Sequence, residues 1–446
     1  MEAIARYFHL EENGTDFKTE AYAGLATFLT MAYIIFINPN ILARQSGSGM
    51  SFAGVVTATV LVSAFSSIFM GLYANLPFAL APGMGINAFF AFTLVKFGGV
   101  SWETALGAVF IAGVVFLILS IMKIREKIVE SIPLSIRYGV SAGIGFFLAF
   151  IGLKSSGFII AHPVTFVTFG GITYKTLVFI FGLLLISALV VKKVKGSLII
   201  GIVLTACVAI ATNKIFGLEG QKIFASIPKE YVSFPNFDVF FKLDITGALS
   251  VGMILPIFTL IFTDMFDSIS TFVGVSEVGG FIDKKTGTPK NVGRALLVDA
   301  FSTTISGLFG TSSGTTYIES AAGVKEGGRT GLTAIVTGIL FLPFLFLAPL
   351  VSVIPDVATA PVLVIIGVFM MQPLSKLDWL VYEKAIPAFL ALVLIPLTYS
   401  ITTGIVWGFL SYSIIKLLIG KIKELPLILW IINIFCIISL SMTIKF

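Results

Sequence analysis

The sequence predicts an all-α polytopic membrane protein of about fourteen transmembrane helices, arranged as two inverted repeats of seven. Of the 446 residues, 57% are hydrophobic and 12% are charged, and the mean hydropathy is +1.04. Apolar runs of about 20 residues, long enough to cross a bilayer, recur along nearly the whole chain. Two interruptions divide these runs, and irregular backbone at membrane depth is tolerated only inside the protein or along a cavity.

The apolar runs give seven predicted spans in each half of the chain. Those of the first half are 21–42, 53–74, 77–96, 102–122, 132–153, 174–192 and 196–216. Those of the second half are 246–275, 292–309, 311–325, 330–350, 357–374, 383–400 and 402–419. An odd number of spans per half inverts the second half relative to the first. A last apolar run, 424–443, either crosses the membrane or lies flat on it, and both alternatives stay open.

The segments around the spans predict the orientation in the cell membrane. Residues 1–20 are polar and are expected in the cytoplasm, while 217–245 is expected to be an extracellular linker between the halves. This orientation puts most Lys and Arg clusters in cytoplasmic loops, as the positive-inside rule requires. Topology and contact with anionic lipid then account for the net charge of +6, so the lipid bilayer is an expected partner and nucleic acid is not.

The two interruptions, 76–90 and 310–331, lie in corresponding positions of the two halves, which is the best sequence indication of a transporter's binding site. Each is expected to contain a short extended segment followed by a half-helix, in spans 3 and 10. The two extended segments are expected to pair. The first N–H groups of each half-helix lack intrahelical partners, so we expect them to face a guest molecule. The alternative for either break alone is a kink that serves helix packing.

Carboxylates at membrane depth form the predicted chemical centre. Asp264 and Asp267 lie three apart on one helix and share a face, and Glu319 begins the second half-helix. Such groups are costly in a membrane and are functional by default. Because burial disfavours the charged form and a helix N-terminus favours it, these three are candidates for proton coupling. Asp267 could instead tie helices together, and Asp299 could be structural or functional.

Neutral residues near the breaks offer further contacts to a ligand. Asn87 carries both a donor and an acceptor, although it could equally form a capping or interhelical hydrogen bond. Phe266, Tyr317, Phe89 and Phe90 could stack on a planar ligand, but most of the 43 phenylalanines are expected to face lipid or core.

The chain lacks the motifs of several other classes. It contains no GxxxxGK[ST] phosphate loop, no HExxH and no CxxC, and its two histidines lie outside the predicted spans. A primary pump and a zinc enzyme are therefore disfavoured. No nucleophile and base pair is recognised, so we expect no enzymatic activity, no cofactor and no metal site.

Several stretches resemble the AzgA-like purine permeases, a branch of the nucleobase-ascorbate (nucleobase:cation symporter) superfamily that also contains the bacterial uracil permease. They are FLTMAYIIFINPNIL (28–42), ALAPGMGINAFFAF (79–92), FTDMFDSISTFVG (262–274), VDAFSTTISGLFGTSSGTTYIESAAGV (298–324), GGRTGLTA (327–334) and IPAFLALVLIPLTYSITTGI (386–405). The run TTYIESAAGV followed by GGRTG is the highly specific part.

The resemblance implies a proton-coupled importer of adenine, guanine or hypoxanthine with a uracil-permease-like fold. It implies a core domain, formed by 21–122 and 246–350, that moves against a gate domain, formed by 131–216 and 356–419. The segment 424–446 remains an apolar C-terminal tail.

The resemblance also implies roles for individual residues. Asp264 and Glu319 match the acidic pair that holds the base, and Asp267 matches a second acid of the family. The absence of a histidine after the span-8 acid, and a longer linker between Glu319 and Arg329, depart from the uracil-permease pattern and favour a purine. The expected substrate-binding set is Asp264, Glu319, Asn87, Gly85, Ile86, Phe266, Thr316 and Tyr317.

Other functions stay open at this point. A sulfate-permease-type anion transporter shares the repeat plan, but its site should present basic groups or bare helix termini instead of acids. A channel would need a continuous polar stripe. The preferred purine and the coupling ion, H⁺ or Na⁺, are left undecided, and the large apolar residues of the gate spans are compatible with a homodimer.

Overall fold

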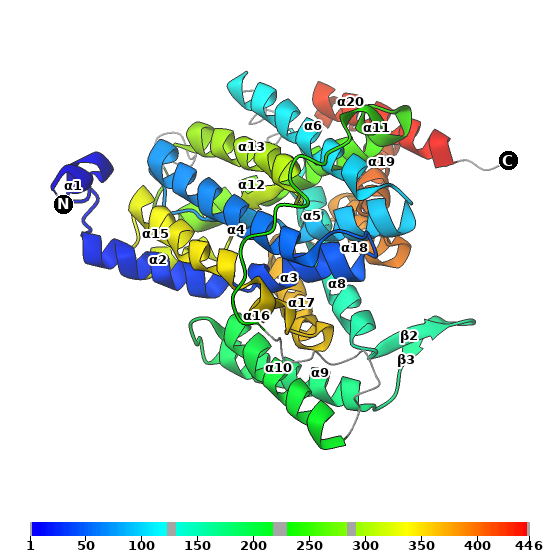
Figure 1. Ribbon diagram of the computed structural model, residues 1–446. Coiled ribbons are helices and arrows are strands. Elements are labelled where there is room, and N and C mark those ends of the chain that lie inside the picture. The colour runs from blue at the N-terminus through cyan, green and yellow to red at the C-terminus, as the bar shows by residue number, and fades with distance from the viewer. Residues whose placement is uncertain (1, 123–130, 217–229, 283–290, 444–446) are drawn as a thin grey trace.

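Long helices lie side by side around a small central pair of strands (Figure 1). The structure is a computed structural model that describes residues 2–122, 131–216, 230–282 and 291–443. Within these ranges, nine helices are long and apolar enough to cross a membrane, and shorter apolar helices accompany them. The predicted fold class, an all-α polytopic membrane protein with short strands at two interrupted spans, is confirmed.

Every predicted span of the first half coincides with helical structure. Serine side chains cap the starts of two of these helices. The hydroxyl groups of Ser51 and Ser101 accept hydrogen bonds from the backbone N–H groups of Gly54 and Thr104, respectively. The elements are α1 (Glu2–Phe8), α2 (Phe17–Met31), α3 (Ile34–Pro39), the wider helical turns η1 (Asn40–Gln45) and η2 (Met70–Ala74) around α4 (Phe52–Phe69), β1 (Leu80–Pro82), α5 (Met84–Ala88), η3 (Phe89–Phe97), α6 (Trp102–Ile121), α8 (Leu134–Ser155), β2 (Ile159–His162), β3 (Phe166–Phe169), α9 (Tyr174–Val191) and α10 (Ser197–Phe216).

The second half repeats the plan. Its elements are α11 (Ile245–Ala248), η4 (Val251–Met253), α12 (Ile254–Gly279), α13 (Val292–Phe309), β4 (Gly314–Thr316), α14 (Ser320–Lys325), α15 (Gly331–Phe341), η5 (Leu342–Phe346), α16 (Ala348–Ser352), α17 (Asp356–Met370), η6 (Gln372–Lys376), α18 (Tyr382–Thr398), α19 (Ile401–Leu418), η7 (Ile422–Glu424) and α20 (Leu427–Thr443). Each predicted span of this half also coincides with helical structure or with the broken element β4–α14.

The two interruptions pair with each other, as predicted. β1 and β4 form an antiparallel pair in which Leu80 lies opposite Thr316, Ala81 opposite Thr315, and Pro82 opposite Gly314. All of these residues are buried. Paired strands at this depth satisfy backbone groups that a lipid environment would leave without partners.

The helices pack in two groups. In one, α13 lies on α6, α15 lies on α2 and α4, and α14 lies on α2. In the other, α17 and α18 lie on α8, α9 packs with α10 and α17, and α19 packs on α18. Whether these groups correspond to a core domain and a gate domain that move relative to each other stays a prediction. Small residues permit the closest approaches: a Cβ atom on Gly331 of α15 would collide with the carbonyl of Gly71.

The sequence analysis did not predict two features. Span 1 is interrupted between α2 and α3, at Ala32 and Tyr33. An antiparallel hairpin, β2–β3, projects from the end of α8, with Ile159 opposite Phe169 (Figure 1). The predicted linker 217–245 is described from residue 230 onward, where it crosses the molecule in an irregular path before α11.

The apolar C-terminal run forms the helix α20, which packs against α19. Asn433 donates a hydrogen bond to Ser413 Oγ at 2.7 Å, and the ring of Phe435 stacks on Phe258 of α12 at 5.3 Å. At the preceding turn, the buried Lys416 bridges Glu383 at 3.0 Å and Glu424 at 2.6 Å. These contacts join α20 to α19 and to α12, so they reach both groups of helices; whether α20 crosses the membrane stays open.

A buried carboxylate joins the first span to the eleventh. Glu20, which is 0% exposed on α2, accepts hydrogen bonds from the backbone N–H groups of Arg329, Thr330 and Thr333 and from the hydroxyl of Thr333. It therefore caps the N-terminus of α15 from another helix. A carboxylate is well suited to this position because it complements the positive end of the helix dipole.

We expect Glu20→Ala to lower the free energy of unfolding by about 2 kcal/mol or more, since buried N–H groups at the start of α15 lose their acceptor. Thermal unfolding of the purified protein in detergent measures the effect. Glu11→Ala, at an exposed position of the N-terminal segment, is the matched control. Equal unfolding temperatures for both variants would contradict the capping role.

Candidate functional site

The ends of the paired strands bring two carboxylates together. Glu319 follows β4 and immediately precedes α14, and Asp267 approaches from α12 with its Oδ2 atom 3.4 Å from Thr315 Oγ1. Both carboxylates are only partly buried. They are close enough to interact electrostatically with each other and with the phenols of Tyr33 and Tyr317. The four side chains form one centre, which we call the Glu319 centre.

Two tyrosines border the Glu319 centre, and their hydroxyl groups form different hydrogen bonds. The hydroxyl of Tyr33 donates to Glu319 Oε1 at 2.7 Å, whereas that of Tyr317 donates to the carbonyl of Pro82 at 2.5 Å. Their rings lie 6.4 Å apart with an interplanar angle of 40°. Tyr317 thus ties the end of β4 to β1, and Tyr33 holds the carboxylate.

Asp264 lies in a second acidic centre, between α12 and α13. It is 0% exposed, and its Oδ2 atom accepts a hydrogen bond from Thr303 Oγ1 at 2.7 Å. The hydroxyl oxygen of Ser268 lies 2.7 Å from Asp299 Oδ1 and 3.3 Å from Asp264 Oδ1, so it bridges the two carboxylates. Thr316 Oγ1 is 3.5 Å from the same oxygen of Asp299. Ser268 therefore links Asp264 to Asp299, while Asp267 interacts electrostatically with both Asp299 and Glu319.

Asn87 joins the two interruptions. It is fully buried on α5, and its side-chain oxygen accepts a hydrogen bond from the hydroxyl of Ser312, which lies two residues before the start of β4. The sequence analysis left open whether Asn87 contacts a ligand, caps a helix or forms a hydrogen bond between elements. The structure contains the last of these, between α5 and the segment before β4. Contact of Asn87 with a substrate stays a prediction.

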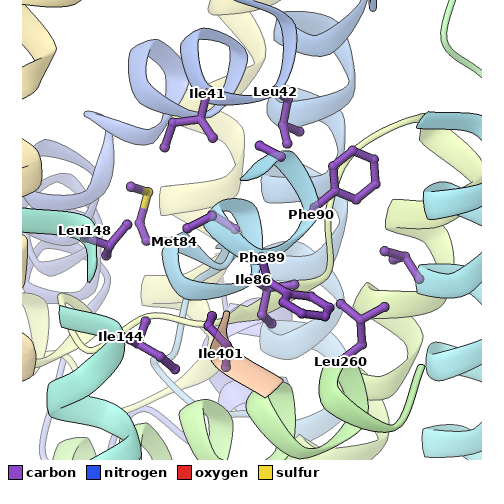
Figure 2. Packing of buried hydrophobic residues seen from close by; sticks show 14 of the residues in the cluster. Ile41, Leu42, Met84, Ile86, Phe89, Phe90, Ile144, Leu148, Leu260 and Ile401 are labelled. Atoms are coloured by element: carbon purple, nitrogen blue, oxygen red, sulfur yellow. The ribbon is translucent and has the colours of Figure 1, made fainter. Parts of the chain in front are cut away.

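Gly85 and Ile86 lie where the first half-helix meets α8. A Cβ atom on Gly85 would lie 2.7 Å from a side-chain carbon of Ile144, so a larger residue would push the two helices apart. Ile86 lies among the apolar side chains of Ile144, Leu260 and Ile401 (Figure 2). The first break is therefore packed tightly against the helices around it.

The expected aromatic contacts are distributed over several environments. Phe266 is 7% exposed and packs edge-on against Phe262 at 5.7 Å, in a row along α12. Phe89 and Phe90 are buried in the apolar core. Of the aromatic residues singled out in the sequence, Tyr317 is the one that contacts the paired strands directly.

One expectation about the second half-helix was wrong. The N–H groups of Ser320, Ala321 and Ala322 donate to the carbonyls of Tyr317, Ile318 and Glu319, at 2.9–3.1 Å. A tight turn before α14 supplies these acceptors, so these amides do not depend on a guest molecule. Contact of the Glu319 side chain with a ligand stays a prediction.

Sequence reasoning missed Tyr33, Ser268 and Thr303 as members of the two centres. A tyrosine inside an apolar span, in the run MAYIIFINPN, is a signal that could have identified Tyr33, because a buried phenol needs a partner. Ser268 and Thr303 carry no such signal. Among the described residues, no cluster of three His, Cys, Asp or Glu side chains could hold a metal ion.

The fold and the two centres define a class. A multi-pass membrane protein with two interrupted spans that converge on buried carboxylates is a membrane transporter. Residues 18–407 match the Permease family of xanthine and uracil permease type, and the chain belongs to that family.

Relatives with established names extend over nearly the whole chain. The guanine/hypoxanthine permease PbuG of Bacillus subtilis is 43% identical over 433 residues, covering 95% of this chain and 96% of the relative. The adenine permeases AdeP and AdeQ of Escherichia coli are 39% and 40% identical to this chain. Each alignment covers 95% of this chain, together with 92% of AdeP and 93% of AdeQ.

Solved structures confirm the fold independently. The transmembrane domain of the cyanobacterial bicarbonate transporter BicA superposes with a TM-score of 0.63 at 17% identity, over 88% of this chain and 97% of that domain. The structure of SLC26A9 gives a TM-score of 0.61 at 11% identity, over 90% of this chain and 65% of that one. At these identities the similarity concerns the fold alone, which contains inverted repeats.

We expect Thr303→Val to destabilise the fold by about 1–3 kcal/mol, because it removes the donor to Asp264 while nearly preserving the side-chain shape. Thr303→Ser keeps the hydroxyl and is the matched control. Thermal unfolding in detergent compares the two variants. If the valine variant were as stable as the serine variant, the Thr303 hydroxyl would not support Asp264.

Proposed function

We propose that this protein imports purine nucleobases (adenine, guanine or hypoxanthine) across the cell membrane. The observation that carries the proposal is the Glu319 centre at the crossing of two interrupted spans. Support comes from the relatives, since the adenine and guanine/hypoxanthine permeases named above are 39–43% identical along nearly the full chain.

The chemistry of the centre suits a purine. A carboxylate accepts N–H donors of a heterocyclic base in strong, charge-assisted hydrogen bonds, and Glu319 and Asp267 offer two such acceptors. Tyr317, with its ring beside them, is placed to contact the face of a planar base. A fixed anion site would present cationic groups or bare helix termini, so the two acids favour a neutral base over an anion.

Coupling to protons is the second part of the proposal. Two carboxylates close together in a low-dielectric interior cannot both carry full charge without a large cost, so one readily takes a proton. We place this exchange on Asp264, Asp267 and Glu319, with Na⁺ as the alternative coupling ion. The hydroxyl bridge from Ser268 links Asp264 to Asp299 and would stabilise a shared charge.

Alternating access completes the proposal. The core group, 21–122 with 246–350, would move against the gate group, 131–216 with 356–419, in a protein whose N-terminus faces the cytoplasm. Few polar contacts cross between the groups. They include Asn40 to Thr359 at 2.8 Å, Thr259 to Thr402 at 2.8 Å, and the ion pair of Lys195 with Glu326 at 3.0 Å. Such contacts are weak enough to break and re-form.

The first test is uptake of radiolabelled adenine, guanine, hypoxanthine and uracil by transport-deficient cells that express the protein. We expect a purine to accumulate, more at mildly acidic than at alkaline pH, and accumulation to collapse with a protonophore. Persistence in sodium-free medium distinguishes H⁺ from Na⁺ coupling. No uptake of any base by cells with the protein in the membrane would favour the anion-transporter alternative, and sulfate or bicarbonate flux would be measured next.

The second test concerns the carboxylates. We expect Asp264→Asn and Glu319→Gln to lower purine uptake by about a hundredfold or more, because each change removes a charge-assisted interaction from the transport cycle. The amount of protein in the membrane should stay constant, as measured by immunoblotting of membranes. Glu11→Gln, far along the chain from both centres, is the control. Normal uptake by both site variants would overturn the site assignment.

A further inference from the structure

Span 1 is interrupted at the level of the Glu319 centre. α2 ends at Met31 and α3 begins at Ile34, and Ala32 and Tyr33 form a turn between them. The backbone stays hydrogen-bonded through this turn: the N–H of Ile35 donates to Ala32 O and that of Phe36 to Tyr33 O, each at 3.1 Å. The turn therefore keeps right-handed helical backbone angles at Ala32 and Tyr33, and the side chain of Tyr33 leaves the span at this turn to reach Glu319.

The side chain of Tyr33 reaches the carboxylate from inside the protein. The residue is 2% exposed, and its hydroxyl donates to Glu319 Oε1 at 2.7 Å. A hydrogen bond to an ionised acceptor is about twice as strong as one between neutral groups. The contact joins residues that are 286 positions apart, so it depends on the assembled fold.

The neighbouring groups cannot replace this contact. The hydroxyl of Tyr317 donates to Pro82 O, and the hydroxyl of Thr315 lies near Asp267. Thr30 Oγ1 approaches the backbone carbonyl of Glu319, at 3.5 Å, and not its side chain. Among the described residues, Tyr33 is therefore the side-chain donor recorded for the Glu319 carboxylate.

We propose that Tyr33 is a positioning residue for substrate capture, which orients the Glu319 carboxylate through the hydrogen bond to Oε1. This inference rests on the function proposed above. With Oε1 held by Tyr33, the carboxylate has one fixed orientation toward the base. A loose carboxylate would lose side-chain entropy on binding, and affinity would fall.

The same hydrogen bond affects proton uptake. Because Tyr33 donates to a carboxylate on which we place the exchange of the coupling proton, loss of its hydroxyl should alter the pH dependence of uptake. The titratable groups facing Glu319 are Asp267 from α12, Tyr317 from its own segment, and Tyr33 from span 1. The negative charge of Asp267 repels that of Glu319. Substitution of Tyr33 leaves Asp267 in place.

The test is Tyr33→Phe, which removes the hydroxyl and keeps the ring. We expect the KM for the transported purine to rise about tenfold with a smaller change in the maximal rate. The pH profile of uptake should also change, which a purely structural role of Tyr33 would not produce. Tyr7→Phe, which loses a hydroxyl that donates to Leu72 O at 2.8 Å near the N-terminus, is the matched control.

A double-mutant cycle with Glu319→Gln separates positioning from a general structural effect. Purine affinity is measured by equilibrium dialysis on purified protein, after thermal unfolding has shown that each variant is folded. If the two residues act as a unit, Tyr33→Phe adds almost nothing in the Glu319→Gln background. Fully additive losses would overturn the proposal.

A second variant keeps the proposal testable if Tyr33→Phe does not fold. Glu319→Asp keeps the charge but shortens the side chain, so it breaks the contact from the other side and should likewise raise the KM for the purine. Wild-type KM and pH profile in Tyr33→Phe would refute the role of Tyr33 and leave purine transport intact. Failure of the unmodified protein to bind or transport any purine would refute the proposed function instead.

Discussion

The need to satisfy backbone hydrogen bonds inside a bilayer determines the centre of this molecule. Each interrupted span exposes N–H and C=O groups where no water is available to bind them. β1 and β4 resolve this together, because each provides the other with a partner strand. Each break depends on the other for its hydrogen bonds, and the end of β4 positions Glu319 beside Asp267 of α12.

The structure divides four acids into two centres with different surroundings. Asp267 and Glu319 are partly exposed beside aromatic rings, whereas Asp264 and Asp299 are fully buried and surrounded by hydroxyl groups. A partly exposed carboxylate can exchange partners with a ligand. A buried one with fixed donors is more suited to holding charge while the helices around it move.

The sequence was sufficient to predict the spans, the two breaks and their pairing, because hydropathy and Gly- and Pro-rich composition report directly on these features. It was not sufficient for the pairing of side chains. The spacing of Asp264 and Asp267 predicts that they share a face of α12. One turn of helix nevertheless separates them, so Asp264 contacts Thr303 and Asp267 contacts Thr315. The turn at Tyr33 has no Gly or Pro to mark it, and the cap formed by Glu20 depends on a partner helix far along the chain.

The cap on α15 has a consequence for biogenesis. Glu20 emerges from the ribosome with the first span, but the amides that it accepts from, such as that of Thr333, are synthesised 313 residues later. Until then a carboxylate at the edge of the first span has no partner within the fold. Newly made first spans must therefore keep this group hydrated or shielded, and the contact between α2 and α15 cannot form until α15 has been synthesised.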